Sequence, residues 1–377
     1  MVNNKRRRRV TYIISNIDKA LAFEWVAAQL DRSHIDLSFI LLNHGSSVLE
    51  DVLYNLGVPT VRVEYNGKKD LLRALWQVRQ QLSTWRTQVV HTHLFEASLI
   101  GLLAAKSLGI SKRILTRHHS TMNYDYYPRG VYYDRLMNAM ATDIIAITEV
   151  VREVLTDRES VPASKIHLIH HGFDLAAFKH PNPATVESLR IKYSTKEKYP
   201  VIGVIARQTA LKGIQYIIPA FAQVLAIYPK AKLLLANAQG DYKTEITAFL
   251  HQYLPSSSYQ EIAFELELSS LYKLFDIYVH TPINSQIEAF GQTYVEALAA
   301  GIPSVFTLSG VASEFIRHEE NALVVPFENS AAIAQAIERF LADANMRERC
   351  RANGQASVAQ QFSLDTYLKA LEELYTA

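Results

Sequence analysis

The sequence has a single cysteine, Cys350, among its 377 residues. One cysteine excludes a disulfide within the chain and fits a reducing compartment. An excess of charge of one sign is also lacking, because 39 basic and 37 acidic residues leave a formal net charge of +2. Nucleic-acid-binding proteins usually carry a basic excess, so the charge gives no reason to expect nucleic acid as a partner.

Long hydrophobic runs are absent as well. The longest candidate, residues 97–105, is far shorter than the roughly 20 apolar residues that cross a bilayer. Basic residues at Lys5 and at 6–9 precede only a brief apolar run that ends at Asn16, which is unlike a secretory signal. We expect a cytoplasmic protein whose basic cluster is a solvated tail leading into the first strand. The alternative is a peripheral contact with anionic lipids at the inner face of the membrane.

Short apolar segments alternate with amphipathic ones along the whole chain, without repeats or low-complexity tracts. This alternation is typical of α/β proteins with parallel, doubly wound sheets. The expected strands cover residues 10–15, 36–43, 89–94, 113–119, 143–148, 201–206, 232–237, 277–281, 302–308 and 322–326. The main expected helices cover residues 20–30, 71–82, 97–108, 330–341 and 364–375.

A proline-rich, polar stretch after residue 178 divides the pattern into two halves. We therefore expect two Rossmann-like domains, at residues 1–180 and 201–360, joined by a linker at 181–200. A C-terminal helix at 361–377 is expected to pack back on the first domain. Ligands of doubly wound sheets bind beside the carboxyl ends of the strands, so a cleft between the two domains is the expected site.

The stretch EAFGQTYVEALAAGIP, residues 288–303, places two glutamates around a helix start. The helix is expected to begin near Phe290 or Gly291, with Glu288 before it and Glu296 about two turns inside it. The unpaired backbone N–H groups between the glutamates favour an anion. A carboxylate accepts two hydroxyl hydrogens, which suits the vicinal diol of a sugar or a ribose.

A second loop, ARQTALKG at residues 206–213, carries Arg207 and Lys212 between a strand and a helix. Two such cations can bind a diphosphate, although solvated loop residues are the simpler interpretation of this loop alone. Together, the two loops match a nucleotide-sugar, with a diphosphate between two sugar rings. The competing interpretation makes Glu296 a solvent-facing helix residue and Glu288 a favourable charge near a helix start.

The 288–303 stretch, followed by SGVASEFI at 309–316, resembles the signature of the family-four retaining glycosyltransferases of the GT-B fold. The ARQTALKG loop resembles the family's diphosphate loop, and the similarity runs from about residue 89 to the C-terminus. The resemblance implies transfer of a sugar, with retention, from a nucleoside-diphosphate sugar to a glycan, lipid-linked or small-molecule acceptor. A UDP-sugar is favoured, a GDP-sugar is the alternative, and neither a cofactor nor a metal is needed.

The resemblance also implies roles for individual residues. The implied catalytic residues are His118, Arg207, Lys212 and Glu288, and the implied donor-binding residues are Phe290, Gly291, Gln292, Thr293 and Glu296. His118 would reach the donor sugar from a strand end of the first domain, and His119 is its rival if the alignment slips by one residue. His91 and His93 share a strand face but lack a third metal ligand, so we expect them to line the cleft. His170 and His171 receive no role.

Two regions bear on the acceptor. The loop after the first strand, SNIDKALAFEW at residues 15–25, has no glycine where many family members are glycine-rich. Side chains of Ser15, Asn16 or Lys19 would fill space that is usually open there. The segment at 121–135 contains five tyrosines, which suit a sugar or lipid-linked acceptor or, alternatively, a packing helix. The candidate acceptor-side residues are Asn16, Lys19, Tyr124, Tyr126, Tyr127 and Arg129.

Two other functions are compatible with these motifs. One is a GT-B enzyme with different chemistry, such as a nucleotide-sugar epimerase or hydrolase. The other is a catalytically silent, glycosyltransferase-like partner subunit, which the presence of every implied diphosphate and sugar ligand argues against. The residue types do not identify the base or the sugar of the donor, nor do they identify the acceptor. They also do not reveal the oligomeric state.

Overall fold

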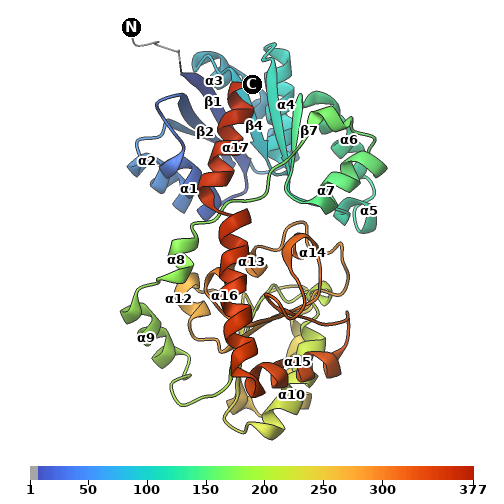
Figure 1. The fold of residues 1–377 in the computed structure, drawn as a ribbon. Coiled ribbons are helices and arrows are strands. Elements are labelled where there is room, and N and C mark those ends of the chain that lie inside the picture. Colours follow the sequence, from blue (N-terminus) through green and yellow to red (C-terminus); the bar gives the residue numbers. More distant parts are fainter. Residues whose placement is uncertain (1–6) are drawn as a thin grey trace. The chain divides into compact units, whose positions relative to one another are not determined.

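The computed structural model describes residues 7–377, which fold as two compact α/β units (Figure 1). Unit 1 contains the described chain up to Phe173 together with Leu364–Ala377, and unit 2 contains Asp174–Ser363. Lys5 and Arg6 of the predicted basic tail lie outside the described residues, whereas Arg8 and Arg9 belong to the first strand. Each unit has a parallel, doubly wound sheet, which confirms the predicted fold class.

The sheet of unit 1 has the strand order β3-β2-β1-β4-β5-β6-β7. Its strands are β1 (Arg8–Ser15), β2 (Ile35–Asn43), β3 (Thr60–Glu64), β4 (Val89–His93), β5 (Lys112–Arg117), β6 (Asp143–Ala146) and β7 (Ile166–Leu168). Its helices are α1 (Leu21–Gln29), α2 (Val48–Asn55), α3 (Leu71–Thr84), α4 (Phe95–Ser107), α5 (Met122–Asp125), α6 (Gly130–Met140), α7 (Glu149–Glu153) and α17 (Leu364–Thr376).

Helices cover both faces of this sheet, which explains the nearly continuous apolar sequence of its central strands. Successive side chains of a strand point to opposite faces. In β1, Ile13 joins a core cluster with Ala74 of α3. The preceding residue, Tyr12, lies on the opposite face and packs against Phe23 of α1 and Tyr375 of α17. The C-terminal helix therefore completes the core of unit 1.

The sheet of unit 2 has the strand order β10-β9-β8-β11-β12-β13. Its strands are β8 (Val201–Ile205), β9 (Lys232–Ala236), β10 (Tyr259–Ile262), β11 (Ile277–His280), β12 (Ser304–Phe306) and β13 (Leu323–Val324). Its helices are α8 (Leu175–Lys179), α9 (Pro183–Lys192), α10 (Ile214–Ile227), α11 (Lys243–Tyr253), α12 (Leu268–Tyr272), α13 (Gln292–Ala299), α14 (Ala312–Phe315), α15 (Ser330–Ala342) and α16 (Ala344–Gln361). Residues 181–200, predicted as a linker, lie within unit 2, where α9 packs against α12.

Three strands that the pattern did not predict, β3, β7 and β10, all lie at sheet edges. Edge strands are partly exposed and carry polar residues, so they lack the continuous apolar run of a central strand. The predicted strand at 302–308 forms the shorter β12. None of the helices in the described part of the chain combines the length and the hydrophobicity needed to cross a membrane.

Candidate functional site

In unit 2 the winding of the sheet reverses between β8 and β11, and such a reversal is where doubly wound sheets bind ligands. The loop after β8 carries Arg207 and Lys212, and β11 ends at His280. Gly213 closes the loop with a φ of +72°, and a Cβ on it would lie 2.0 Å from the carbonyl oxygen of Thr281. Glycine is therefore required for the Lys212 loop to approach the end of β11.

Lys212, His280 and Glu288 form a compact polar cluster at this place. Lys212 Nζ lies 2.5 Å from Glu288 Oε1, and His280 Nε2 lies 2.9 Å from the same oxygen. The backbone N–H of Glu288 donates to Ser309 Oγ at 3.0 Å. Glu288 is only 8% exposed. The structure thus brings together two residues that the sequence placed 76 positions apart.

The charge states in this cluster follow from its contacts. Burial raises the pKa of Glu288, but the hydrogen bond from His280 and the charge of Lys212 outweigh it and lower that pKa to about 2. Burial lowers the pKa of His280 below its ordinary value. Glu288 is therefore ionised beside a neutral His280, and the hydrogen bond assigns the histidine proton to Nε2.

Helix α13 begins at Gln292, next to the predicted start, and Gly291 precedes it with a φ of +89°. A Cβ on Gly291 would lie 2.6 Å from the ring of Tyr294, so the turn into the helix also requires glycine. The Phe290 ring is buried against Phe362, with ring centroids 5.8 Å apart. In the first turn, Gln292 is exposed and Thr293 is half-buried.

Glu296 lies on the buried side of α13 and is 7% exposed, so the interpretation as a solvent-facing residue is wrong. The hydroxyl of Tyr272, on α12, donates to Glu296 Oε2 at 2.9 Å. Burial raises the pKa of Glu296 to about 7, and the Tyr272 hydrogen bond opposes this shift only in part. The two glutamates around the helix start therefore have opposite pKa shifts.

The two predicted diphosphate ligands differ in their surroundings. Lys212 is paired with Glu288, and only about a fifth of its side chain is exposed. Arg207 is exposed and forms no ion pair with any residue in the 7–377 range. An anion beside this loop would therefore meet one cation that has a partner and one that is accessible.

In unit 1 the winding reverses between β1 and β4, and histidines gather at the neighbouring strand ends. His93 Nδ1 lies 3.1 Å from His118 Nε2. The ring of His118 stacks on that of His171, with centroids 5.6 Å apart and an interplanar angle of 13°. His91 contacts Thr116 Oγ1 at 2.7 Å through Nε2. His171, which had no predicted role, thus belongs with His118.

Burial keeps this histidine cluster neutral. It lowers the pKa of His91 to about 3 and that of His171 to about 4. It also lowers the pKa values of His93 and His118 well below the ordinary value, and the neighbouring histidines add to the shift. Across the described residues, no group of three or more His, Cys, Asp or Glu side chains could hold a metal ion.

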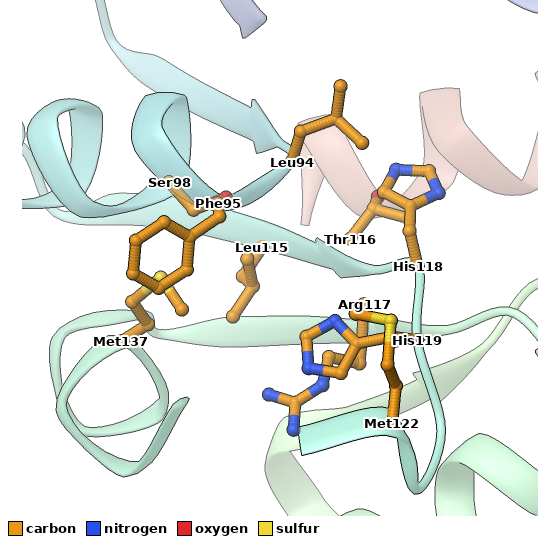
Figure 2. A pocket seen from close by; sticks show the side chains of 10 residues that line it. All are labelled: Leu94, Phe95, Ser98, Leu115, Thr116, Arg117, His118, His119, Met122 and Met137. Atoms are coloured by element: carbon orange, nitrogen blue, oxygen red, sulfur yellow. The ribbon is translucent and has the colours of Figure 1, made fainter. Parts of the chain in front are cut away.

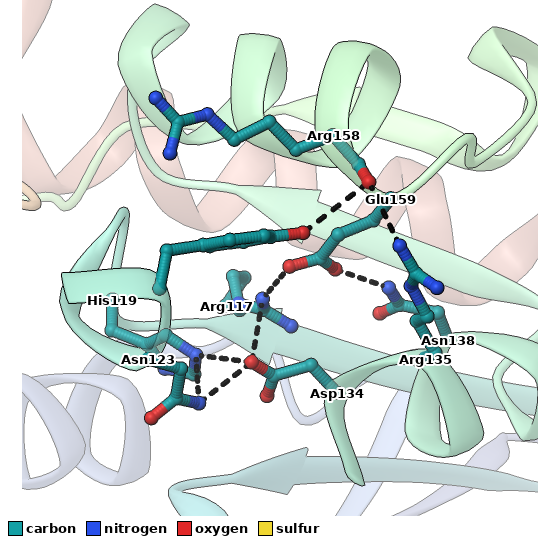
Figure 3. A network of polar contacts seen from close by, with 9 residues as sticks. Arg117, His119, Asn123, Asp134, Arg135, Asn138, Arg158 and Glu159 are labelled. Atoms are coloured by element: carbon teal, nitrogen blue, oxygen red, sulfur yellow. Dashed lines mark hydrogen bonds and ion pairs between the residues drawn. The ribbon is translucent and has the colours of Figure 1, made fainter. Parts of the chain in front are cut away.

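His118 and His119 have different partners. His118 contacts the histidine cluster, whereas His119 Nε2 lies 3.1 Å from Asp134 Oδ2, in a buried polar network (Figure 3). Both histidines also line one cavity of unit 1 (Figure 2). The predicted catalytic position, His118, is therefore the one of the two that contacts His93.

Two family models match the chain and together span most of it. Residues 26–177 match the model described as Glycosyltransferase Family 4, and residues 185–357 match the one described as Glycosyl transferases group 1. The chain belongs to the family-four glycosyltransferases. The first match covers mainly unit 1 and the second lies within unit 2, so both halves of this glycosyltransferase contribute to the assignment.

Curated relatives of the glycosyltransferase are distant. An uncharacterized glycosyltransferase of Methanocaldococcus jannaschii is 28% identical over 236 residues, which are 62% of this chain and 59% of that protein. The capsular polysaccharide biosynthesis glycosyltransferase CapM of Staphylococcus aureus is 26% identical over 76% of each chain.

Solved structures share the fold of the whole glycosyltransferase. Anabaena HepE in complex with UDP-glucose has a TM-score of 0.83 and 18% identity, over 98% of this chain and 100% of that one. Sucrose-phosphate synthase from Thermosynechococcus elongatus has a TM-score of 0.77 and 17% identity, over 98% of each chain. These neighbours are GT-B enzymes, and the glycosyltransferase has the GT-B fold.

The glycine-free loop after β1 is held by an asparagine. Asn16 adopts a left-handed φ of 53°, a conformation that asparagine tolerates better than most residues. The side chain of Asn43 then contacts both backbone groups of Ile17, accepting from its N–H at 3.1 Å and donating to its carbonyl at 2.6 Å. Asn16 and Lys19 are exposed, whereas Ser15 is buried and its Oγ accepts from the backbone N–H of Ala97 at 3.3 Å.

The tyrosine-rich segment of the glycosyltransferase divides into α5 and α6. Tyr126, Tyr127 and Arg129 are exposed. Tyr124 is half-buried, and its hydroxyl donates to the carbonyl of Arg158 at 3.3 Å. Tyr124 therefore packs within unit 1, while the other three predicted acceptor-side residues of this segment are open to solvent.

Sequence reasoning missed three residues that contact Glu288 or Glu296: His280, Ser309 and Tyr272. The available signals were weak. His280 ends an apolar strand, which marks the ligand-binding edge of a sheet, and Ser309 lies inside a motif already noted for its resemblance. Nothing in the sequence near Tyr272 indicates that it contacts Glu296, 24 residues away.

Proposed function

We propose that this glycosyltransferase moves a sugar, with retention at the anomeric carbon, from a nucleoside-diphosphate sugar to a hydroxyl-bearing acceptor without a metal ion. A UDP-sugar is the favoured donor. The observation that carries the proposal is the pair of buried glutamates on either side of the glycine-led start of α13. Their burial, at 8% and 7% exposure, is costly for carboxylates and is unexplained by surface charge alone.

In this proposal each glutamate binds one ring of the donor. Glu288, ionised and fixed by Lys212 and His280, accepts hydrogen bonds from hydroxyls of the transferred sugar. Glu296 accepts hydrogen bonds from both ribose hydroxyls, which satisfy the ionised, buried carboxylate. The backbone N–H groups at the start of α13, next to Gly291, face the diphosphate between the two rings.

The leaving group determines the role of the cations. When the bond between the anomeric carbon and the phosphate oxygen breaks, negative charge grows on the diphosphate. Arg207, exposed and without an ion pair among the described residues, and Lys212 stabilise that charge. With two cations and a helix start assigned to it, the diphosphate does not require a divalent metal. The acceptor proton passes to the departing phosphate on the same face of the sugar, and His118 is assigned to the transferred sugar.

The relatives support the choice of donor and acceptor classes to be tested first. The structure of HepE was determined with UDP-glucose, and CapM is named for capsular polysaccharide biosynthesis. We therefore place UDP-sugars first among donors and carbohydrate or lipid-linked hydroxyl compounds first among acceptors.

A thermal-shift panel of UDP-, GDP- and ADP-sugars, with and without EDTA, tests the proposal. A ligand present at a hundred times its dissociation constant stabilises the folded protein by about 2.7 kcal/mol. We expect a shift with one nucleotide class, unchanged by EDTA and lost in Glu296→Ala and Arg207→Ala. Lys230→Ala is the matched control, because Lys230 is exposed before β9, at the opposite ends of the strands.

Two results would count against the proposal. No shift with any nucleotide-sugar would contradict a donor site and favour a silent partner subunit. A shift followed by release of free or epimerised sugar, with no transfer to any acceptor, would assign hydrolase or epimerase chemistry instead.

A further inference from the structure

A cavity of about 240 Å³ in unit 1 is not used by the donor-side residues (Figure 2). Its walls are mainly apolar and are formed by Leu94, Phe95, Leu115, Met122 and Met137. Two methionines and an aromatic ring suit a flat apolar guest, because thioethers make favourable contacts with aromatic rings. An apolar cavity of about 150 Å³ already admits benzene, so this one has room for a substituted ring.

Two buried polar side chains that line this cavity have unused hydrogen-bonding atoms. Ser98, on α4, is 1% exposed, and its Oγ has no hydrogen-bond partner among the described residues. Arg117, at the end of β5, is 2% exposed, and its Nε and Nη1 likewise have none among residues 7–377. Buried polar atoms without partners are rare and costly, so a guest that carries an oxygen would satisfy them.

The charge around Arg117 excludes an anionic guest. Arg117 Nη2 lies 3.1 Å from Asp134 Oδ2 and is also paired with Glu159 (Figure 3). Burial raises the pKa of Asp134, but the His119 hydrogen bond and the Arg117 charge outweigh it and hold that pKa below its ordinary value. Two carboxylates thus already compensate one guanidinium, and a third negative charge would be repelled.

His119 also lines the cavity wall. Its Nε2 lies 3.1 Å from Asp134 Oδ2 and 3.2 Å from Asn123 Nδ2, so this nitrogen is already engaged in the polar network. Among the described residues, the unused polar atoms of the cavity are therefore donors from Arg117 and the hydroxyl of Ser98, which can donate or accept.

We propose that this cavity binds a neutral, ring-sized group of the acceptor that carries a hydroxyl, as a phenol does. The proposal deepens the proposed function, because it names a class of acceptor and places part of it next to His118, which lines the same cavity. The hydroxyl accepts from Arg117 and donates to Ser98, while the ring packs against the apolar wall.

Ligand-observed NMR tests this inference by measuring the binding of phenol, benzene and benzoate to the full chain. We expect phenol to bind at least about tenfold more tightly than benzene, because its hydroxyl gains buried hydrogen bonds, and we expect benzoate not to bind. In Ser98→Ala the advantage of phenol should shrink several-fold while the affinity for benzene is unchanged. Benzoate binding as tightly as phenol, or no binding of either neutral ring, would overturn the proposal.

A substitution that fills the cavity with a larger side chain provides the second test. Ser98→Leu should abolish binding of both phenol and benzene, whereas Ser107→Leu, at the end of the same helix and outside the cavity lining, should leave both unchanged. If Ser98→Leu fails to fold, the Ser98→Ala comparison still decides. UDP-sugar binding is measured on the same samples. Phenol binding without UDP-sugar binding would overturn the proposed function alone. UDP-sugar binding without phenol binding would overturn the cavity proposal alone.

Discussion

In each unit a cluster of side chains lies beside the strands where the winding of the sheet reverses. In unit 2 this is a charged set, Lys212 and Glu288 with His280. In unit 1 it is a neutral set that includes His93 and His118. Both sets are partly or fully buried at the carboxyl edge of a parallel sheet. The charged set tolerates burial because Lys212 and Glu288 compensate each other. The histidines tolerate it because they are neutral.

This difference determines what each sheet edge is suited to bind. A compensated ion pair beside the start of α13 and an exposed Arg207 suit a charged, hydroxyl-rich donor. Neutral imidazoles suit an uncharged ring, which they can approach without a desolvated charge. The two edges should therefore respond differently to loss of a charge and to a change of pH.

The largest expected effect is on the charged set. Glu288→Gln replaces the carboxylate by an amide that carries no charge to balance Lys212 and accepts through only one oxygen. We expect the rate of sugar transfer to fall by about 10²- to 10³-fold, as when one electrostatic group is lost from an active site. Initial rates with the donor identified by thermal shift would measure this. Glu348→Gln, which breaks an exposed ion pair on α16, is the control, and an equal rate in both variants would remove Glu288 from the mechanism.

The neutral set should respond to acid. The pKa of buried His91 is about 3, below its ordinary value, so the unfolded chain takes up the proton first as the pH falls. Its contribution to stability is complete above about pH 6.5 and declines below it, by about 2 kcal/mol between pH 7 and pH 5. In unit 2, Glu296 has a raised pKa, so its protonation adds stability as the pH falls toward 4.5 and offsets His280.

Hydrogen exchange, corrected for the intrinsic dependence of exchange on pH, would compare the two units directly. We expect β4 and β5 to lose more protection than β8 and β11 between pH 7 and pH 5. Equal losses in the two sheets would show that the histidine cluster does not set the acid sensitivity of unit 1.

The same physical distinction explains which parts of the fold were predictable. Central strands such as β1 and β8 are covered on both faces, and their continuous apolar sequence predicts them. The edge strands β3, β7 and β10 are partly polar and were missed. The boundaries of unit 2 depend on α9 packing against α12, a contact between segments far apart in the sequence that proline and polar composition do not reveal.

In the candidate site, local motifs were informative and long-range partners were not. Glu288, Gly291 and Glu296 lie within nine residues of one another and form a recognisable pattern. The charge state of each glutamate depends on residues elsewhere: His280 and Lys212 lower one pKa, and burial beside Tyr272 leaves the other raised. The stacking of His171 on His118 likewise required the folded chain.

A smaller effect should appear in the pH dependence of donor binding. In the proposed site only ionised Glu296 can accept hydrogen bonds from both ribose hydroxyls, and its pKa is about 7. The affinity for a UDP-sugar, whose diphosphate does not titrate in this range, should therefore rise about tenfold from pH 6 to pH 8, following the ionised fraction. Calorimetric titration would measure this. Glu296→Gln should flatten the profile, and a wild-type affinity that does not change with pH would separate Glu296 from the ribose.

The smallest expected effect concerns Tyr272. Tyr272→Phe removes the hydroxyl that donates to Glu296 Oε2 at 2.9 Å, and with it the interaction that partly opposes the raised pKa of Glu296. The pKa should rise further, so donor affinity at pH 7 should fall by about three- to tenfold, the equivalent of one hydrogen bond. The loss should shrink at pH 9, where Glu296 is ionised in both proteins.

Tyr294→Phe is the control, because it removes a comparable buried hydroxyl that donates to the carbonyl of Thr307 at 2.9 Å. It should leave the midpoint of the pH profile of donor binding unchanged. A loss in Tyr272→Phe that persists at pH 9 would mean that the hydroxyl stabilises the fold or contacts the donor, and that burial alone determines the pKa of Glu296.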